Sequence, residues 1–184
     1  GGGDAGADGA AGDSAAMGAP VPAAGDTGMS GMGAAAEPAP RDTNQAFLRM
    51  MIDHHHGLVA MSDTAMPRLA GATAKADAQK LRDKQAAEGQ RMAGMLQSTY
   101  ADAHAPMLMP SNRAMLDSVR TAPAGADADR TYYRQVIAHH REGIAMTERM
   151  MPHLTGEVRA MAEKMVTEQR AGIAEFERKA GGGA

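Results

Sequence analysis

The sequence predicts an all-α protein, a four-helix bundle made of two copies of one helical hairpin. The first observation is composition: aromatic residues make up 3% of the chain, whereas methionine occurs 17 times and cysteine is absent. A core must therefore consist of Ala, Leu, Ile, Val and Met, a set that favours helices. The second is an internal repeat, in which the segment around His54 returns around His139 at a shift of 85 residues. Each hairpin has one apolar face, and the two hairpins can bury these faces against each other. The repeat therefore predicts a bundle with internal pseudo-twofold symmetry.

The N-terminal residues are predicted to lie outside this bundle. Residues 1–40 consist almost entirely of Gly, Ala, Pro, Asp and Ser with a few Met. Such a segment cannot bury enough apolar surface to offset the entropy lost on ordering. We therefore predict a disordered tether over residues 1–41 and a helical bundle over residues 42–180.

The first repeat, residues 43–100, reads as one helical hairpin. Its first helix is expected from about Thr43 to Met66, where the apolar spacing is helical. Pro67 and Gly71 then break the helix. The second helix is expected from about Thr73 to Tyr100.

The second repeat, residues 127–180, has the same pattern. Its helices are expected from about Asp127 to Met151 and from about Thr155 to Lys179, again separated by a proline and a glycine. A linker over residues 101–126 joins the repeats. It begins with a stretch punctuated by prolines and continues as a short helix that Ser111 is expected to cap.

Each repeat carries two adjacent histidines, followed six residues later by a methionine. On a helix, His54 and Met61 fall on the apolar face and His55 flanks it, while Asp53 and His56 fall outside and are expected to be solvated. Imidazole nitrogen and thioether sulfur suit copper in either oxidation state. The predicted metal ligands are therefore His54, His55, Met61, His139, His140 and Met146.

Other residues are secondary candidates for the same chemistry. Met66 and Met151 lie on the same side of their helices as the histidines, and the linker brings His104, Met107 and Met109 into six residues. Methionine at helical spacing is also ordinary core filling, and a lone buried histidine is more often bonded to a carbonyl than to a metal. The four histidines in two matched pairs favour the metal interpretation.

Several functions are excluded or disfavoured by the sequence. A formal net charge of −3 with interspersed acids and bases gives no basic face for nucleic acid, and no stretch approaches the length of a membrane span. No Glu is followed by His three residues later, so no di-iron site is expected. Absence of cysteine excludes thiolate zinc sites and attached c-type haem.

The motifs resemble one known family. Met-Ile-Asp-His-His-His-Gly-Leu-Val-Ala-Met, ending at Met61, its partner Val-Ile-Ala-His-His-Arg-Glu-Gly-Ile-Ala-Met, ending at Met146, and His104-Ala-Pro-Met-Leu-Met-Pro are similar to the family called domain of unknown function 305. The resemblance runs from about Asn44 to Lys179. It implies a ferritin-like helical bundle, usually exported, with members linked to copper binding and copper tolerance.

The resemblance also marks positions in the second helix of each repeat. Gln85 and Glu88 match a Gln-x-x-Glu element of the family. In the second repeat Gln169 is followed by Gly172 where the acid is expected, so the two halves differ there.

We therefore expect an extracytoplasmic copper protein, with Cu(I) or Cu(II) as cofactor, that sequesters, buffers or delivers metal and is not an enzyme. The chain begins with Gly1 and a Gly/Ala/Asp-rich segment, as a secreted protein or a processed lipoprotein would. The main alternative is a structural or interaction module with a buried histidine network and no metal, and non-covalent haem ranks last. The sequence leaves open whether the metal sites number one or two, and whether the chain forms a homo-oligomer.

Overall fold

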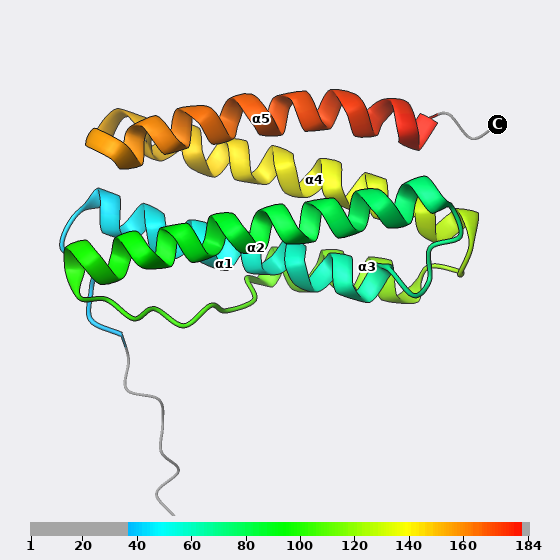
Figure 1. Ribbon diagram of the computed structural model, residues 1–184, viewed down its shortest axis with the longest axis horizontal. Coiled ribbons are helices and arrows are strands. Elements are labelled where there is room, and N and C mark those ends of the chain that lie inside the picture. Colours follow the sequence, from blue (N-terminus) through cyan, green and yellow to red (C-terminus); the bar gives the residue numbers. More distant parts are fainter. Residues whose placement is uncertain (1–36, 182–184) are drawn as a thin grey trace, which may run out of the picture. The chain divides into compact units, whose positions relative to one another are not determined.

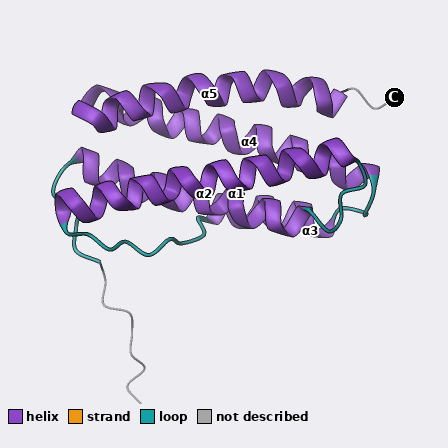
Figure 2. Ribbon diagram, in the orientation of Figure 1, coloured by secondary structure: helices purple, strands orange, loops and turns teal. Residues whose placement is uncertain are grey.

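The computed structural model describes residues 37–181, and in this range every regular element is helical, which confirms the predicted all-α fold (Figure 2). The observed limits of the four long helices lie close to the predicted ones. The elements are α1 (Thr43–Ala65), α2 (Ala72–Tyr100), α3 (Pro110–Thr121), α4 (Ala126–Met150), the 3-10 turn η1 (Met151–His153) and α5 (Gly156–Gly181).

The long helices form two hairpins that pack together. α1 lies along α2, and α4 lies along α5, as the repeat predicts (Figure 1). The hairpins meet mainly through α1 and α4, and the short α3 packs against both of these helices. This places the two histidine-bearing helices at the centre of the bundle.

Local signals explain where the helices begin. Asp42 caps α1, because its side chain accepts a hydrogen bond from Gln45 N at 2.8 Å. α2 has no side-chain cap, but the other hairpin holds the segment before it, since Asp129 accepts hydrogen bonds from the amides of Ala70 and Gly71, each at 2.9 Å. The prediction that Ser111 caps the linker helix is wrong. That helix starts at Pro110, whose fixed φ suits a first helical position, and it has no side-chain cap.

The predicted tether, residues 1–41, lies outside the described residues except for its last five. Those five residues are attached to the bundle. Pro38 O accepts a hydrogen bond from Arg49 at 2.7 Å, and Glu37 contacts His104 at 2.8 Å. The chain therefore reaches the bundle before α1 begins.

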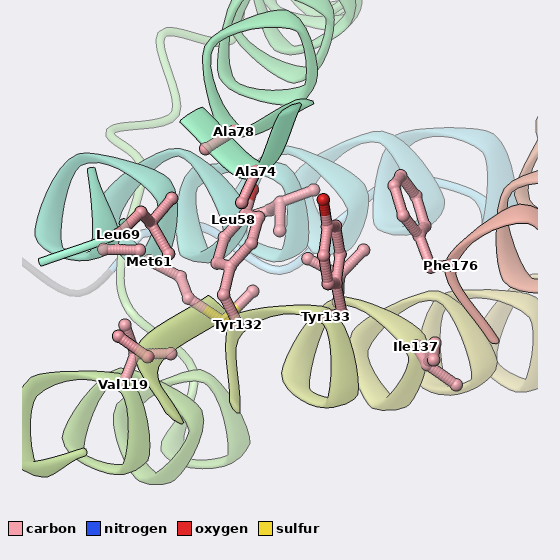
Figure 3. Close-up of a cluster of buried hydrophobic side chains, with 13 residues drawn as sticks. Leu58, Met61, Leu69, Ala74, Ala78, Val119, Tyr132, Tyr133, Ile137 and Phe176 are labelled. Atoms are coloured by element: carbon pink, nitrogen blue, oxygen red, sulfur yellow. The ribbon is translucent and has the colours of Figure 1, made fainter. Parts of the chain in front are cut away.

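The core divides into two clusters along α1 and α4. The tyrosine cluster contains Leu58, Met61, Ala65, Leu69, Ala74, Ala78, Val119, Ala128, Tyr132, Tyr133, Val136, Ile137 and Phe176 (Figure 3). The methionine cluster contains Phe47, Leu48, Met51, Ile52, Met92, Leu96, Met146, Leu154, Val158, Ala162 and Met165. None of the described helices combines the length and the apolar character that a membrane crossing needs.

The clusters show that α1 and α4 run antiparallel. Met61 follows His54 by seven residues and packs with Tyr132, which precedes His139 by seven, and Ser62 Oγ lies 2.8 Å from the Tyr132 hydroxyl. At the other end, Phe47 packs with Met146. The pseudo-twofold axis therefore passes between His54 and His139.

Candidate metal centre

The four predicted histidines form a polar layer between the two apolar clusters. We call His54, His55, His139 and His140 the histidine layer. All four are buried, with exposures of 4% or less. The rings of His54 and His139 are stacked across the axis, with centroids 3.7 Å apart and planes 13° apart. The structure therefore brings the two histidine pairs together, although they are 85 residues apart in the chain.

Backbone carbonyls orient two rings of the layer. His139 Nε2 lies 2.9 Å from His54 O, and His55 Nδ1 lies 2.9 Å from Met51 O, so these nitrogens donate. Histidines that bind metals usually donate their other ring N–H to a carbonyl or a carboxylate in this way. The remaining nitrogens are Nδ1 of His139, which has no hydrogen-bond partner, and Nε2 of His55.

His55 has a second acceptor at its outer nitrogen. Nε2 lies 3.0 Å from Glu88 Oε2, so an oxygen faces each ring nitrogen. A neutral imidazole carries only one N–H and can satisfy only one of these acceptors. This end of the layer is therefore suited to the positive charge of a metal ion.

Other polar atoms of the layer have no partner. Both ring nitrogens of His54, Nδ1 of His139 and Nδ1 of His140 are buried without a hydrogen bond of normal geometry, and so are both amide atoms of the adjacent Gln169. Leaving a buried polar atom unpaired typically costs about 1–3 kcal/mol, so such a group needs an explanation, for which a bound ion is one. A ring nitrogen that carries no proton and accepts no hydrogen bond has a lone pair available to bind a metal ion.

Three rings of the layer, those of His54, His139 and His140, are neutral because their pKa values are lowered. Burial lowers the pKa of His54 well below its ordinary value, and the neighbouring histidines lower it further. Burial likewise lowers the pKa of His139 to about 3 and that of His140 to about 4. Neutral imidazole is the form that binds metal, and these rings stay neutral over the whole physiological range.

Gly143, which sequence reasoning missed, makes room for the layer. A Cβ at this position would lie 2.6 Å from His54 Nε2 and 2.8 Å from Gln169 Oε1. The first repeat has Leu58 at the equivalent place. The signal in the sequence was a glycine at a buried position inside a helix, where glycine is unfavourable by roughly 1 kcal/mol unless packing requires it.

The two ends of the layer differ, as the resemblance indicated. Glu88 faces His55, whereas Gly172 lies beside His140, and a Cβ there would lie 3.3 Å from His140 Nε2. His140 lines a cavity of about 290 Å³ between α2 and α5, together with Lys84, Glu168 and Phe176. The His140 end is therefore open to this cavity, and the carboxylate that faces His55 has no counterpart there.

The predicted methionine ligands are divided between the clusters. Met61 is buried in the tyrosine cluster and Met146 in the methionine cluster, on opposite sides of the histidine layer. Met66 and Met151 are partly buried against the same two clusters. The structure therefore does not bring Met61 and Met146 together. Apolar packing explains the position of each side chain.

Of the linker candidates, His104 and Met109 contact other residues and Met107 is exposed. His104 contacts Glu37 through Nδ1 and Asp53 through Nε2, both at 2.8 Å. Met107 is 61% exposed, and Met109 packs on the methionine cluster. The expectation that Asp53 is solvated is wrong, because its carboxylate binds the His104 ring and the Met107 amide.

This arrangement gives His104 its own pH dependence. Burial opposes its charge, but the hydrogen bonds that the ring donates to the Glu37 and Asp53 carboxylates outweigh burial and raise the pKa of His104. A raised pKa means that the stabilisation is fully present below the unfolded value of about 6.5 and disappears as the pH rises through the folded pKa. We expect His104→Gln to lower the free energy of unfolding by about 1–3 kcal/mol at pH 6, and by less at pH 9.

Urea unfolding at the two pH values measures this effect. His153→Gln, at an exposed position of η1, serves as the control and should change neither value. An equal loss at pH 6 and pH 9 for His104→Gln would contradict the ion-pair explanation.

In the described part of the chain, no three His, Asp or Glu side chains already converge as a set that could hold a metal ion. His54, His139 and His140 nevertheless each have a buried ring nitrogen without a hydrogen-bond partner, and the rings of His54 and His139 are stacked. Metal binding there requires side-chain rotation, for example of the stacked rings.

Sequence comparison places the chain beside one family. The model of the family described as domain of unknown function (DUF305) matches residues 5–96 and, in a second overlapping match, residues 44–180. None of the curated protein sequences matches the chain significantly.

Solved structures share the fold. A DUF305 fragment from Deinococcus radiodurans is 24% identical, with a TM-score of 0.67 over 79% of this chain and 99% of that one. A DUF305 protein from Streptomyces coelicolor, described as a candidate secreted protein, is 21% identical, with a TM-score of 0.61 over 73% and 90%. CopM in its Cu(I)-bound form is 23% identical, with a TM-score of 0.62 over 73% and 93%.

Proposed function

The chain belongs to the family of domain of unknown function 305, and on this premise we propose that it binds copper and sequesters, buffers or delivers it. The observation that carries the proposal is the histidine layer, in which buried, neutral imidazole nitrogens have no hydrogen-bond partner. We propose no catalytic step, because holding the metal is itself the function.

Copper is favoured by the chemistry of the donors. Imidazole suits Cu(I) and Cu(II) alike, and affinity for nitrogen donors is highest for copper among the divalent first-row metals. The chain has no cysteine that would favour zinc and no Glu-x-x-His that would favour di-iron chemistry. CopM, which shares the fold, has been solved with Cu(I) and with Cu(II), and this supports the choice of metal.

The ligands that we propose are the histidines. His55 and His139 each have one ring nitrogen fixed on a carbonyl, so the opposite nitrogens would reach the metal. His54 and His140 supply the further donors. Met61 and Met146 belong to the apolar clusters and are not needed in this set.

We propose an extracytoplasmic location, either secreted or attached to a membrane as a lipoprotein. The relative from Streptomyces coelicolor, described as a candidate secreted protein, supports this proposal. The length and composition of the Gly/Ala/Pro-rich N-terminal sequence suit a spacer between the bundle and an anchor.

Copper content after equilibrium dialysis tests the function. The wild-type chain should retain copper, and replacing all four histidines of the layer by Ala should remove most of it. Because four cavities could unfold the bundle, His54→Leu with His139→Leu is the second variant, since Leu keeps the volume of the stacked rings. His56→Gln with His153→Gln removes two histidines outside the layer and should leave the copper content unchanged.

Melting temperature separates this function from a metal-free histidine network. A metal that binds only the folded state must stabilise it, so Cu(II) should raise the melting temperature of the wild-type chain and not that of His54→Leu/His139→Leu. If copper changes neither the wild-type melting temperature nor its metal content, the layer is a structural network and the proposal is wrong.

A further inference from the structure

The methionines of this chain are unevenly distributed over the bundle. Four are buried in the methionine cluster and six more pack against it, which makes ten of the 17 in the sequence. They are Met51, Met92, Met146 and Met165, and, partly buried, Met50, Met95, Met109, Met150, Met151 and Met161. The tyrosine cluster has far fewer, with Met61 buried and Met66 and Met115 against it.

A small cavity that opens to the surface lies at the methionine-rich end, between α2 and α5. Its volume is about 80 Å³, and its walls include Met92, Met161 and Met165. Met92 is fully buried and Met165 is 6% exposed. Methionine is flexible and polarizable, so it can turn its sulfur toward such a space. Three methionines therefore line one space that an ion can enter from the surface.

The outer wall of the cavity is charged but balanced. Glu88 and Glu168 line it together with Arg91 and Lys164. The carboxylate of Glu168 is bonded to Lys84 at 2.8 Å, which lowers its pKa, so it stays anionic. Because two acids face two bases, electrostatics alone does not select a cation here. Selection has to come from the thioethers.

Thioether sulfur is a soft, uncharged ligand that favours Cu(I) and similar soft monovalent cations. We propose that Met92, Met161 and Met165 form a second metal site for such a cation, separate from the histidine layer. The site goes beyond the function proposed above, since it uses other ligands and does not depend on the histidines. Glu88 borders both places, because it lines this cavity and also contacts His55.

Substitution by leucine removes the sulfur and keeps the volume, so Met92→Leu/Met161→Leu/Met165→Leu should fold. Ag(I) serves as the probe, because it is a soft monovalent cation that needs no reductant. With methionine methyl groups labelled with ¹³C, the wild-type signals of these three residues should shift on addition of Ag(I). The triple variant should bind about one silver ion fewer per chain than the wild type by elemental analysis.

Two controls make the result specific. Met66→Leu/Met115→Leu changes two methionines at the tyrosine cluster and should bind as much silver as the wild type. His54→Leu/His139→Leu should keep the methyl shifts, so the two sites can fail independently. The proposal is overturned if Ag(I) leaves the signals of Met92, Met161 and Met165 in place, or if the triple variant keeps the full silver content.

Discussion

The metal-free protein should lose several kcal/mol of stability between pH 7 and pH 5, because three histidines of the layer are held neutral. Burial lowers the pKa of His139 to about 3 and that of His140 to about 4, and it lowers the pKa of His54 as well. In the unfolded chain each would titrate near 6.5. The unfolded state therefore binds more protons than the folded state once the pH falls below about 6.5.

The stability of the folded protein therefore falls as the pH falls. Above about pH 6.5 the rings are neutral in both states and the stability is at its full value. It decreases as the pH falls, and the decrease continues to about pH 4 for His140 and about pH 3 for His139. At pH 5 each of these two rings should cost roughly 2 kcal/mol, a large part of the 5–15 kcal/mol that stabilises a typical domain.

Urea unfolding of metal-free protein at pH 7 and pH 5 measures this loss. The His104 ion pair keeps its full strength at low pH and partly offsets the loss, so His104→Gln is the background in which the effect is cleanest. In that background, His139→Leu should reduce the loss by roughly 2 kcal/mol. Equal unfolding free energies at the two pH values would show that the layer takes up protons without unfolding.

The fold was predictable from the sequence because its signals are local or repeated. Pro67 and Gly71 lie between the first helix and the second, as predicted. The repeat then required two equal hairpins with the histidines inside. The start of α3 was placed wrongly because Ser111 is a good capping residue in general, while Pro110 was already suited to the first helical position.

The site was predictable only in part. The burial of His54, His55, His139 and His140 follows from helical periodicity, but the stacking of His54 on His139 depends on how two helices cross. Periodicity also placed Met61 on the same face as His54, yet two helical turns, about 11 Å, separate them along the axis. Sharing a face is therefore not sufficient for sharing a metal.

The contacts of the linker could not be predicted, for a different reason. Asp53 falls outside the apolar face of α1, and a helical wheel cannot show that an irregular segment folds over it. The contact between Asp53 and His104 joins residues 51 positions apart through such a segment. No repeat or periodicity carries that information.

Gly143→Ala should destabilise the bundle by about 1–3 kcal/mol and weaken copper binding, although alanine is the better helix former by roughly 1 kcal/mol. The new methyl group would lie 2.6 Å from His54 Nε2. Gln169 can move its amide away, but the ring of His54 is fully buried and stacked on His139, so displacing it disturbs the stacked pair. Gly143→Leu, which copies Leu58 of the first repeat, should have a larger effect.

Gly94→Ala in α2 is the matched control, because an added Cβ there meets nothing within 4 Å. With only helix propensity acting, it should stabilise the protein by up to about 1 kcal/mol. The two Gly→Ala substitutions are therefore expected to have opposite signs in urea unfolding, and only Gly143→Ala should reduce the copper retained after dialysis. If both variants are more stable than the wild type and both retain copper, the histidine layer does not depend on the absence of a side chain at Gly143.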